Sequence, residues 1–210
     1  MSTQSQSQSR PTIIGLIGGV ASGKSVVAEG LAKRGGLWIN ADRAAHEVLN
    51  QPEVIEKVTS HFGTSVIAST GLVDRRALAQ KVFGPSDTAQ QNRKALESWI
   101  HPRLRSQLES QIRDAGQRYP AIIIDAPLLL EAGWASMCDR IVLVDTPLSL
   151  RQTLAASRGW DGDELARREA SQMPLFEKRS YATDILPNAG TLKELDTEVT
   201  RFWSRIHSGA

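Results

Sequence analysis

Eight residues near the start of the chain, GGVASGKS at 18–25, have the types and the spacing of a phosphate-binding loop. Gly18 is followed after four residues by Gly23, Lys24 and Ser25, which is the P-loop pattern GxxxxGK[ST]. Small residues let backbone N–H groups approach an anion closely, and the first turn of a helix adds partial positive charge. We therefore predict an ATP site in which Lys24 reaches the β- and γ-phosphates and the Ser25 hydroxyl binds Mg²⁺. The residues assigned to this site are Gly19, Val20, Ala21, Ser22, Gly23, Lys24, Ser25 and Val26.

Two aspartates follow apolar runs that would place them beside this loop. Asp125 ends the run AIIID, and Asp42 comes two residues after the run LWIN. The carboxyl ends of parallel strands meet at one edge of a sheet, where a P-loop also lies. At that edge Asp125 could orient Mg²⁺ or its bound waters, and Asp42 could accept the proton of an attacking hydroxyl group. Asp42 could equally be the N-cap of the helix that follows it, which requires no catalytic role.

The expected elements alternate between strands and helices, which favours an α/β fold with a parallel sheet. Residues 43–118 show helical patterns and no convincing strand. Within them apolar residues recur every four positions from 96 to 112, and Pro102 is predicted to end one helix at His101 and to begin the next. The five expected strands are 12–17, 36–40, 119–127, 139–147 and 182–188, and the clearest expected helix is 192–206.

Composition limits the classes of protein to which the chain can belong. A length of 210 residues, 40% of them hydrophobic, is sufficient for one sizeable domain. The formal net charge of +2 gives no case for nucleic-acid binding. Cys138 is the single cysteine, which excludes an intramolecular disulfide and leaves no cysteine–histidine metal motif. Because residues 1–11 are rich in Ser and Gln and no apolar run reaches the length of a membrane span, we expect a disordered tail on a cytoplasmic protein, without membrane contact or an obligate protein partner.

Several segments together resemble the dephospho-CoA kinase family, which carries out the last step of coenzyme A synthesis. The ordered match extends over nearly the whole chain after the tail, so it is more specific than the P-loop alone. Its most telling parts are the P-L-L-x-E run at 127–131 and the R-x-x-x-Q run at 168–172. The others are GLIGGVASGKS at 15–25, INADRAAHEV at 39–48, GLVDRRALAQKVF at 71–83, LESWIHP at 96–102 and DILPNAGTLKEL at 184–195.

This resemblance implies an α/β fold like that of nucleoside monophosphate kinases: a five-stranded parallel sheet with helices on both faces, an inserted helical lobe for the acceptor and an arginine-rich helical lid. The implied core covers about 12–42, 119–150 and 182–210, with the acceptor lobe at about 43–118 and the lid at about 151–181. The resemblance also implies that ATP, with Mg²⁺, phosphorylates the ribose 3′-hydroxyl of dephospho-CoA.

The same resemblance assigns roles to single residues. Asp42 becomes the candidate general base, and Arg158 and Arg168 become catalytic cations of the lid, alongside Lys24. Asn188 corresponds to an asparagine near the adenine of ATP. The residues assigned to acceptor binding are Asp42, Arg75 and His101, and those assigned to Mg²⁺ are Ser25 and Asp125.

The chain departs from the family pattern mainly in the lid. Leu154 replaces an arginine that commonly lies four residues before Arg158. Arg151, one helical turn earlier, is a candidate to substitute for it, and its role stays open. Gly159 and Trp160 stand where an acidic or amide residue is common.

Two other functions remain open at this point. One is a P-loop kinase that acts on another small acceptor, such as a nucleoside monophosphate. The other is an NTP-binding regulatory module that hydrolyses slowly and binds polynucleotides through its arginines. The near-neutral net charge and the absence of the guanine-reading motif N-K-x-D from the sequence count against the second.

Overall fold

The computed structural model describes residues 10–84 and 86–207. Contacts within the chain divide it into two compact units. Of the described residues, 10–40 and 112–207 together form the first, which we call the core unit, and 41–84 with 86–111 form the second, which we call the helical unit. Residues 1–9 of the predicted tail lie outside the described residues.

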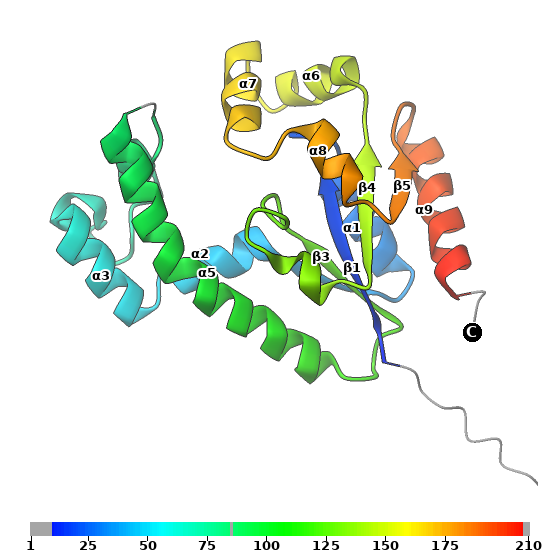
Figure 1. Ribbon diagram of the computed structural model, residues 1–210, viewed down its shortest axis with the longest axis horizontal. Coiled ribbons are helices and arrows are strands. Elements are labelled where there is room, and N and C mark those ends of the chain that lie inside the picture. Colours follow the sequence, from blue (N-terminus) through cyan, green and yellow to red (C-terminus); the bar gives the residue numbers. More distant parts are fainter. Residues whose placement is uncertain (1–9, 85, 208–210) are drawn as a thin grey trace, which may run out of the picture. The chain divides into compact units, whose positions relative to one another are not determined.

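A five-stranded parallel sheet forms the centre of the core unit (Figure 1). The strand order is β2-β3-β1-β4-β5, so the first strand of the chain lies in the middle. The strands are β1 (Thr12–Gly18), β2 (Leu37–Asn40), β3 (Ala121–Asp125), β4 (Arg140–Asp145) and β5 (Asp184–Pro187). The predicted parallel sheet of five strands is therefore confirmed, although β2, β3, β4 and β5 are shorter than expected.

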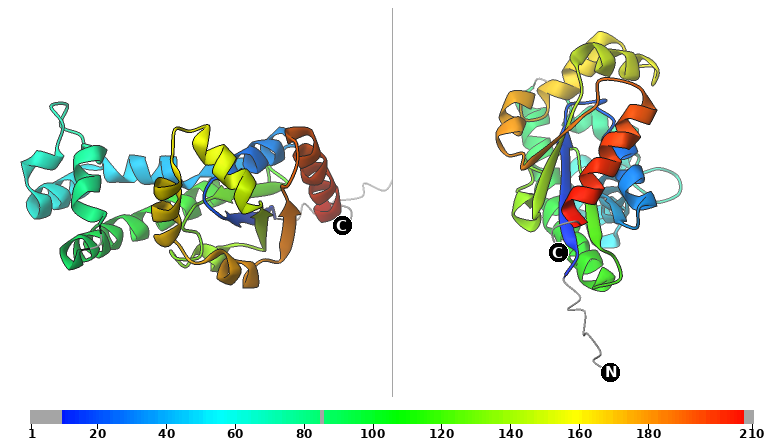
Figure 2. Two further views of the ribbon diagram at one scale, coloured as in Figure 1. Left: turned by 90° about the horizontal axis from the view of Figure 1, so that it is seen from above. Right: turned by 90° about the vertical axis from the view of Figure 1, so that its right-hand side faces the viewer.

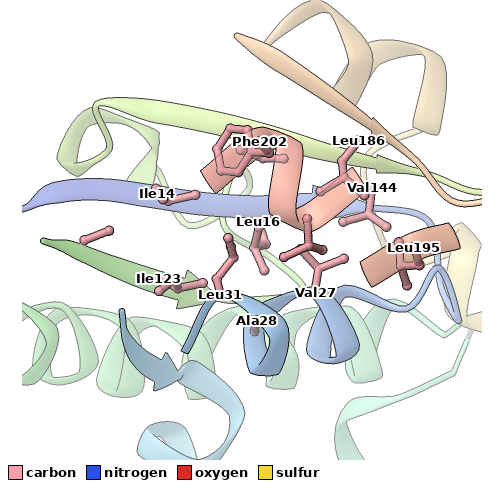
Figure 3. Packing of buried hydrophobic residues seen from close by; sticks show 13 residues of the cluster. Ile14, Leu16, Val27, Ala28, Leu31, Ile123, Val144, Leu186, Leu195 and Phe202 are labelled. Atoms are coloured by element: carbon pink, nitrogen blue, oxygen red, sulfur yellow. The ribbon is translucent and has the colours of Figure 1, made fainter. Parts of the chain in front are cut away.

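Two helices cover one face of the sheet. They are α1 (Lys24–Lys33), which follows the P-loop, and α9 (Leu192–His207), which follows β5. Figure 2 shows both on the same side of the sheet, and Figure 3 shows their apolar side chains packed on the strands. Leu192 is 73% exposed, because it is the first residue of α9. The buried cluster includes Ile14, Leu16, Val27, Ala28, Leu31, Ile123, Val144, Leu186, Leu195 and Phe202.

The opposite face of the sheet is covered by α8 (Leu175–Ser180) and by the segment after β3, which contains the short helix η2 (Trp134–Met137) (Figure 2). Leu129 and Cys138 from this segment both pack against Gly15 of β1. Burial, helped by the negative charge of Asp139, raises the pKa of the Cys138 thiol to about 12. Cys138 is therefore protonated at neutral pH and lacks the reactive thiolate.

The helical unit consists of α2 (Ala41–Leu49), α3 (Pro52–Phe62), η1 (Thr64–Val66), α4 (Arg75–Val82) and the first part of α5 (Asp87–Ala115). Aromatic rings join α3 to α5, because His61 and Phe62 both meet Trp99 edge to face. The Asn92 amide donates to the carbonyl of Lys81 at 3.0 Å and so joins α4 to α5. Although α5 has 29 residues, neither it nor any other helix in the described parts of the chain is long and apolar enough to cross a membrane.

Pro102 lies inside α5, so the predicted helix boundary at His101 is wrong. A proline in a helix interior provides no N–H for the carbonyl four residues earlier, which here belongs to Ser98. The guanidinium of Arg103 donates to the neighbouring carbonyl of Trp99 at 3.3 Å. The helix also buries Leu104 and Leu108, and a break at Pro102 would disturb that packing.

Candidate active site

The P-loop connects the end of β1 to the first turn of α1, and the two glycines of its pattern occupy positions that require glycine. At Gly18 the carbonyl oxygen of Val144 lies only 2.8 Å from where a Cβ atom would be. Gly23 has a φ of 85°, a left-handed conformation that residues with side chains rarely adopt. Ala21 also has a positive φ, of 58°, and its methyl group is buried. The predicted strand–loop–helix arrangement is thus present.

The carbonyl of Ser22 anchors this loop to the ends of two strands. Thr146 donates its hydroxyl to that oxygen at 2.8 Å, and the Asn188 side-chain amide donates to it at 3.0 Å. The backbone also fixes Asn188, because its N–H donates to the carbonyl of Asp145 at the end of β4 at 2.8 Å. Asn188 is therefore buried against the P-loop, and its closeness to the adenine of ATP stays a prediction.

Lys24 and Ser25 place an ammonium group and a hydroxyl at the end of the loop. The Lys24 ammonium donates to the carbonyls of Gly18 at 3.3 Å and Gly19 at 3.0 Å. The Ser25 hydroxyl donates to Oδ2 of Asp125 at 2.9 Å, so the two residues assigned to Mg²⁺ meet at the carboxyl edge of the sheet. A hydroxyl and a carboxylate are oxygen ligands of the kind that Mg²⁺ prefers, and they fit the ion.

No group of three or more His, Cys, Asp and Glu side chains suited to a metal ion exists within residues 10–84 and 86–207. Mg²⁺ in nucleotide sites is usually held by one or two protein oxygens together with phosphates and waters. The Ser25 hydroxyl and the Asp125 carboxylate would be these protein oxygens.

The residues assigned to the acceptor all lie in the helical unit. Asp42 is exposed in the first turn of α2, so it is not the N-cap of that helix. It follows Asn40 by two residues along the chain, and Asn40 lies opposite Asp125 in the sheet register. Arg75 is the exposed first residue of α4, and His101 is half-buried within α5. Their roles stay predictions.

Two helices after β4, α6 (Leu148–Ala156) and α7 (Gly162–Ala170), belong to the predicted lid. The guanidinium groups of Arg168 and Arg158 lie over the ring of Trp160, with Cζ atoms 4.1 Å and 5.5 Å from its centroid. Trp160 also packs against a buried cluster that contains Val20 and Ala21 of the P-loop. Trp160 therefore holds both arginines near the P-loop through cation–π contacts.

Arg151, whose role the sequence left open, lies directly against the P-loop. Its Nη1 and Cζ atoms are 2.9 Å and 3.1 Å from the position that a Cβ atom would take at Gly19. Its Nε donates to the carbonyl of Thr146 at 3.2 Å, and Nη1 pairs with the carboxylate of Glu169 in α7. Burial lowers the pKa of this guanidinium below its usual value. The loop thus has an arginine beside it although Leu154 supplies none.

A buried lysine that the sequence analysis missed, Lys178, joins the P-L-L-x-E run at 127–131 to the R-x-x-x-Q run at 168–172. The Lys178 ammonium donates to the carbonyl of Pro127 at 3.3 Å and to the side-chain oxygen of Gln172 at 2.9 Å. It also pairs with Glu131 at 3.3 Å, and Glu131 accepts the N–H of Met173 at 2.7 Å. The available signal was Glu131, a carboxylate shortly after a buried strand, which requires a compensating charge.

Solved structures of kinases share this fold. A dephospho-CoA kinase from Campylobacter jejuni aligns with a TM-score of 0.65 at 21% identity, covering 96% of this chain and 100% of the other. A shikimate kinase from Acinetobacter baumannii aligns with a TM-score of 0.52 at 13% identity, covering 94% of each chain. At these identities the likeness concerns the fold alone. Together with the P-loop that follows β1, it defines a P-loop kinase-like α/β fold.

A family model described as dephospho-CoA kinase matches residues 12–194. The chain belongs to the dephospho-CoA kinase family. The dephospho-CoA kinase of Rhodopirellula baltica is 40% identical over 200 residues, which cover 93% of each chain. That of Symbiobacterium thermophilum is 35% identical and is matched over 94% of this chain and 82% of its own. A Thermus thermophilus protein of known crystal structure has a TM-score of 0.79 at 33% identity, covering 94% of this chain and 99% of its own.

Proposed function

We propose that the protein transfers the γ-phosphoryl group of ATP to the ribose 3′-hydroxyl of dephospho-CoA, giving CoA and ADP, with Mg²⁺ on the nucleotide. The observation that carries the proposal is the Ser25–Asp125 pair beside a P-loop, in a chain that matches the dephospho-CoA kinase family over residues 12–194. The relatives in Rhodopirellula baltica and Symbiobacterium thermophilum, both named dephospho-CoA kinase, support the choice of acceptor.

Transfer in one step requires the protein to bind and orient the phosphates. Loop N–H groups and the Lys24 ammonium would hold the β- and γ-phosphates. Ser25 and Asp125 would hold Mg²⁺, which neutralises phosphate charge when it is bound. Arg158 and Arg168 would bring further positive charge to the transferred group when the lid closes over it.

Asp42 would receive the proton that the acceptor hydroxyl loses. The 3′-oxygen bonds to the γ-phosphorus as the bond to the β-phosphate oxygen breaks, and the hydroxyl proton passes to the Asp42 carboxylate. ADP leaves with the electrons of the broken bond. No phosphorylated form of the protein is required.

The acceptor is tested by an assay of ADP release with Mg²⁺ and ATP, comparing dephospho-CoA, AMP, UMP and no acceptor. We expect release to depend on dephospho-CoA, and mass spectrometry to show one added phosphate on its 3′-hydroxyl. Transfer to AMP or UMP instead would assign the protein to another acceptor. Slow hydrolysis without any acceptor, together with salt-sensitive polynucleotide binding, would indicate the regulatory module.

The role of Asp42 is tested by Asp42→Asn, which keeps the shape of the side chain but removes its basicity. We expect ATP affinity to be nearly unchanged and turnover to fall by about 10²-fold or more, the usual share of a general base. Asp87 is also an acidic residue in the first turn of a helix of the helical unit. Asp87→Asn is therefore the matched control and should keep full turnover. Full turnover in Asp42→Asn would exclude it as the base.

A further inference from the structure

Arg151 is a buried cation beside the P-loop that the proposed function does not use. Its side chain is 8% exposed. A buried guanidinium is unfavourable unless hydrogen bonds and an opposite charge compensate it. Its two hydrogen-bond partners are the carbonyl of Thr146 and the carboxylate of Glu169. Glu169 is thus the anion that Arg151 contacts.

Arg151 and Lys24 approach the same residue of the loop. The Lys24 ammonium donates to the carbonyl of Gly19 at 3.0 Å, while Nη1 of Arg151 lies 2.9 Å from the Cβ position of Gly19. The missing side chain at Gly19 makes room for the guanidinium, since even a methyl group would collide with it. Two cations near one residue repel each other, and a polyanion such as a triphosphate relieves that repulsion.

The two members of the Arg151–Glu169 pair differ in how easily they can move. Arg151 is held by Thr146, whose hydroxyl also holds the carbonyl of Ser22 in the P-loop. The Glu169 side chain is 34% exposed, so it can turn towards water with a small desolvation change. An incoming anion would therefore displace Glu169 and leave Arg151 in place.

We propose that Arg151 binds a phosphate group of the nucleotide and that Glu169 competes with that phosphate for the guanidinium. Phosphate and carboxylate compete for the same planar guanidinium, which suits both. Arg151 thereby supplies the positive charge that Leu154 does not. The inference rests on the proposed function only in taking ATP as the nucleotide.

Calorimetric titration with Mg²⁺ and the non-hydrolysable analogue AMPPNP tests the competition. Arg151→Gln should weaken binding by about 10- to 100-fold, the share of a charge-assisted hydrogen-bond pair. Glu169→Gln should instead tighten binding, by about 3- to 10-fold, because it removes the competing anion. Changes of opposite sign are the decisive result. A pair that only holds the lid in place would weaken binding in both variants.

Two further variants complete the design. Arg151→Lys keeps the positive charge but lacks the planar guanidinium that can donate two parallel hydrogen bonds, so it should retain part of the affinity. It replaces Arg151→Gln in the test if circular dichroism shows that Arg151→Gln does not fold. Arg167 lies on α7, the helix that carries Glu169; it is exposed and pairs with Glu164. Arg167→Gln is therefore the control and should bind like the wild type. Unchanged affinity in both Arg151 variants, or weaker binding in Glu169→Gln, would overturn the proposal. Because the titration contains no acceptor, its outcome is independent of whether dephospho-CoA is phosphorylated.

Discussion

Gly15 is a residue whose missing side chain shapes the core. A Cβ atom there would lie 2.7 Å from both the Sγ of Cys138 and the Cδ1 of Leu129. These distances are far shorter than an ordinary van der Waals contact, so either side chain or strand must shift to admit a methyl group. The close packing of β1 on the segment after β3 therefore depends on glycine at this position.

Gly15→Ala should lower the free energy of unfolding by about 1–3 kcal/mol, the usual effect of overpacking a core. Urea unfolding followed by circular dichroism measures it. The control is Gly162→Ala at the first residue of α7, where no atom lies within 4 Å of the Cβ position. The control should be as stable as the wild type or slightly more so. Equal stability of both variants would contradict the prediction, because it would mean that Cys138 and Leu129 can move away from the added methyl group at no cost in stability.

Single residues could be predicted from the sequence where their chemistry leaves a local pattern. The P-loop residues follow a fixed spacing, and Asp125 ends an apolar run that had to be a strand. The buried positions of Arg151 and Lys178 could not be predicted. Each cation is buried because it pairs with a carboxylate that lies far along the chain or on another helix, and no local pattern shows such a pairing. Those partners are Glu169 for Arg151 and Glu131 for Lys178. Arginine and lysine are otherwise read as surface residues.

Among the elements, α9 begins with a reciprocal pair of hydrogen bonds. The Thr191 N–H donates to Oε2 of Glu194 at 2.7 Å, and the Glu194 N–H donates to the Thr191 hydroxyl oxygen at 3.3 Å. This arrangement is a capping box, which satisfies two N–H groups at the start of a helix. The backbone N–H and the hydroxyl of Thr191 hold the pKa of the Glu194 carboxyl below its usual value.

This cap predicts a pH dependence of stability. Because the pKa of Glu194 is lowered in the folded chain, its stabilisation is fully present above the ordinary glutamate pKa and is lost as the pH falls through the lowered one. Glu194→Gln should therefore lose less stability than the wild type over that acidic range. Thr191→Ala should cost about 1 kcal/mol at neutral pH. Urea midpoints at several pH values provide the measurement, and parallel profiles for Glu194→Gln and wild type would contradict it.

The types of the elements could be predicted better than their boundaries. Apolar runs identified four of the strands, because a strand covered on both faces requires them. The fifth was expected at 182–188 although that segment contains an acidic residue and a proline, and only Leu186 of β5 is buried. The helix boundary predicted at Pro102 was wrong, because the prediction considered only the backbone hydrogen bond that a proline removes. Burial of Leu104 and Leu108 by the same continuous helix outweighs that effect. Such packing depends on other elements and leaves no mark in the residues next to the proline.

For the whole molecule, nucleotide binding should increase the resistance to heat. A ligand that binds only the folded chain adds about 2.7 kcal/mol at one hundred times its Kd. AMPPNP with Mg²⁺ should therefore raise the Tm as its concentration rises. Lys24→Ala should remove most of this increase, because the ammonium beside Gly18 and Gly19 is lost. Scanning calorimetry measures both proteins. A wild-type Tm that ignores AMPPNP would contradict a phosphate site in the loop.

The fold class could be predicted from the alternation of strands and helices, but the order of the strands could not. Strand order depends on which distant segments pair, and no local pattern records that choice. Here β1 pairs with β3 through Thr12 and Ala121, and with β4 through Ile14 and Arg140. Both partners come much later in the chain.

The central place of β1 has a consequence for synthesis. The strand leaves the ribosome first, yet its neighbours Ala121–Asp125 and Arg140–Asp145 leave it long afterwards. Until then its apolar run has no native pairing and is open to chaperones or to aggregation. A nascent chain that stops before the fourth strand therefore leaves one edge of the central strand β1 unpaired, and proteases can remove it before it ever holds a nucleotide.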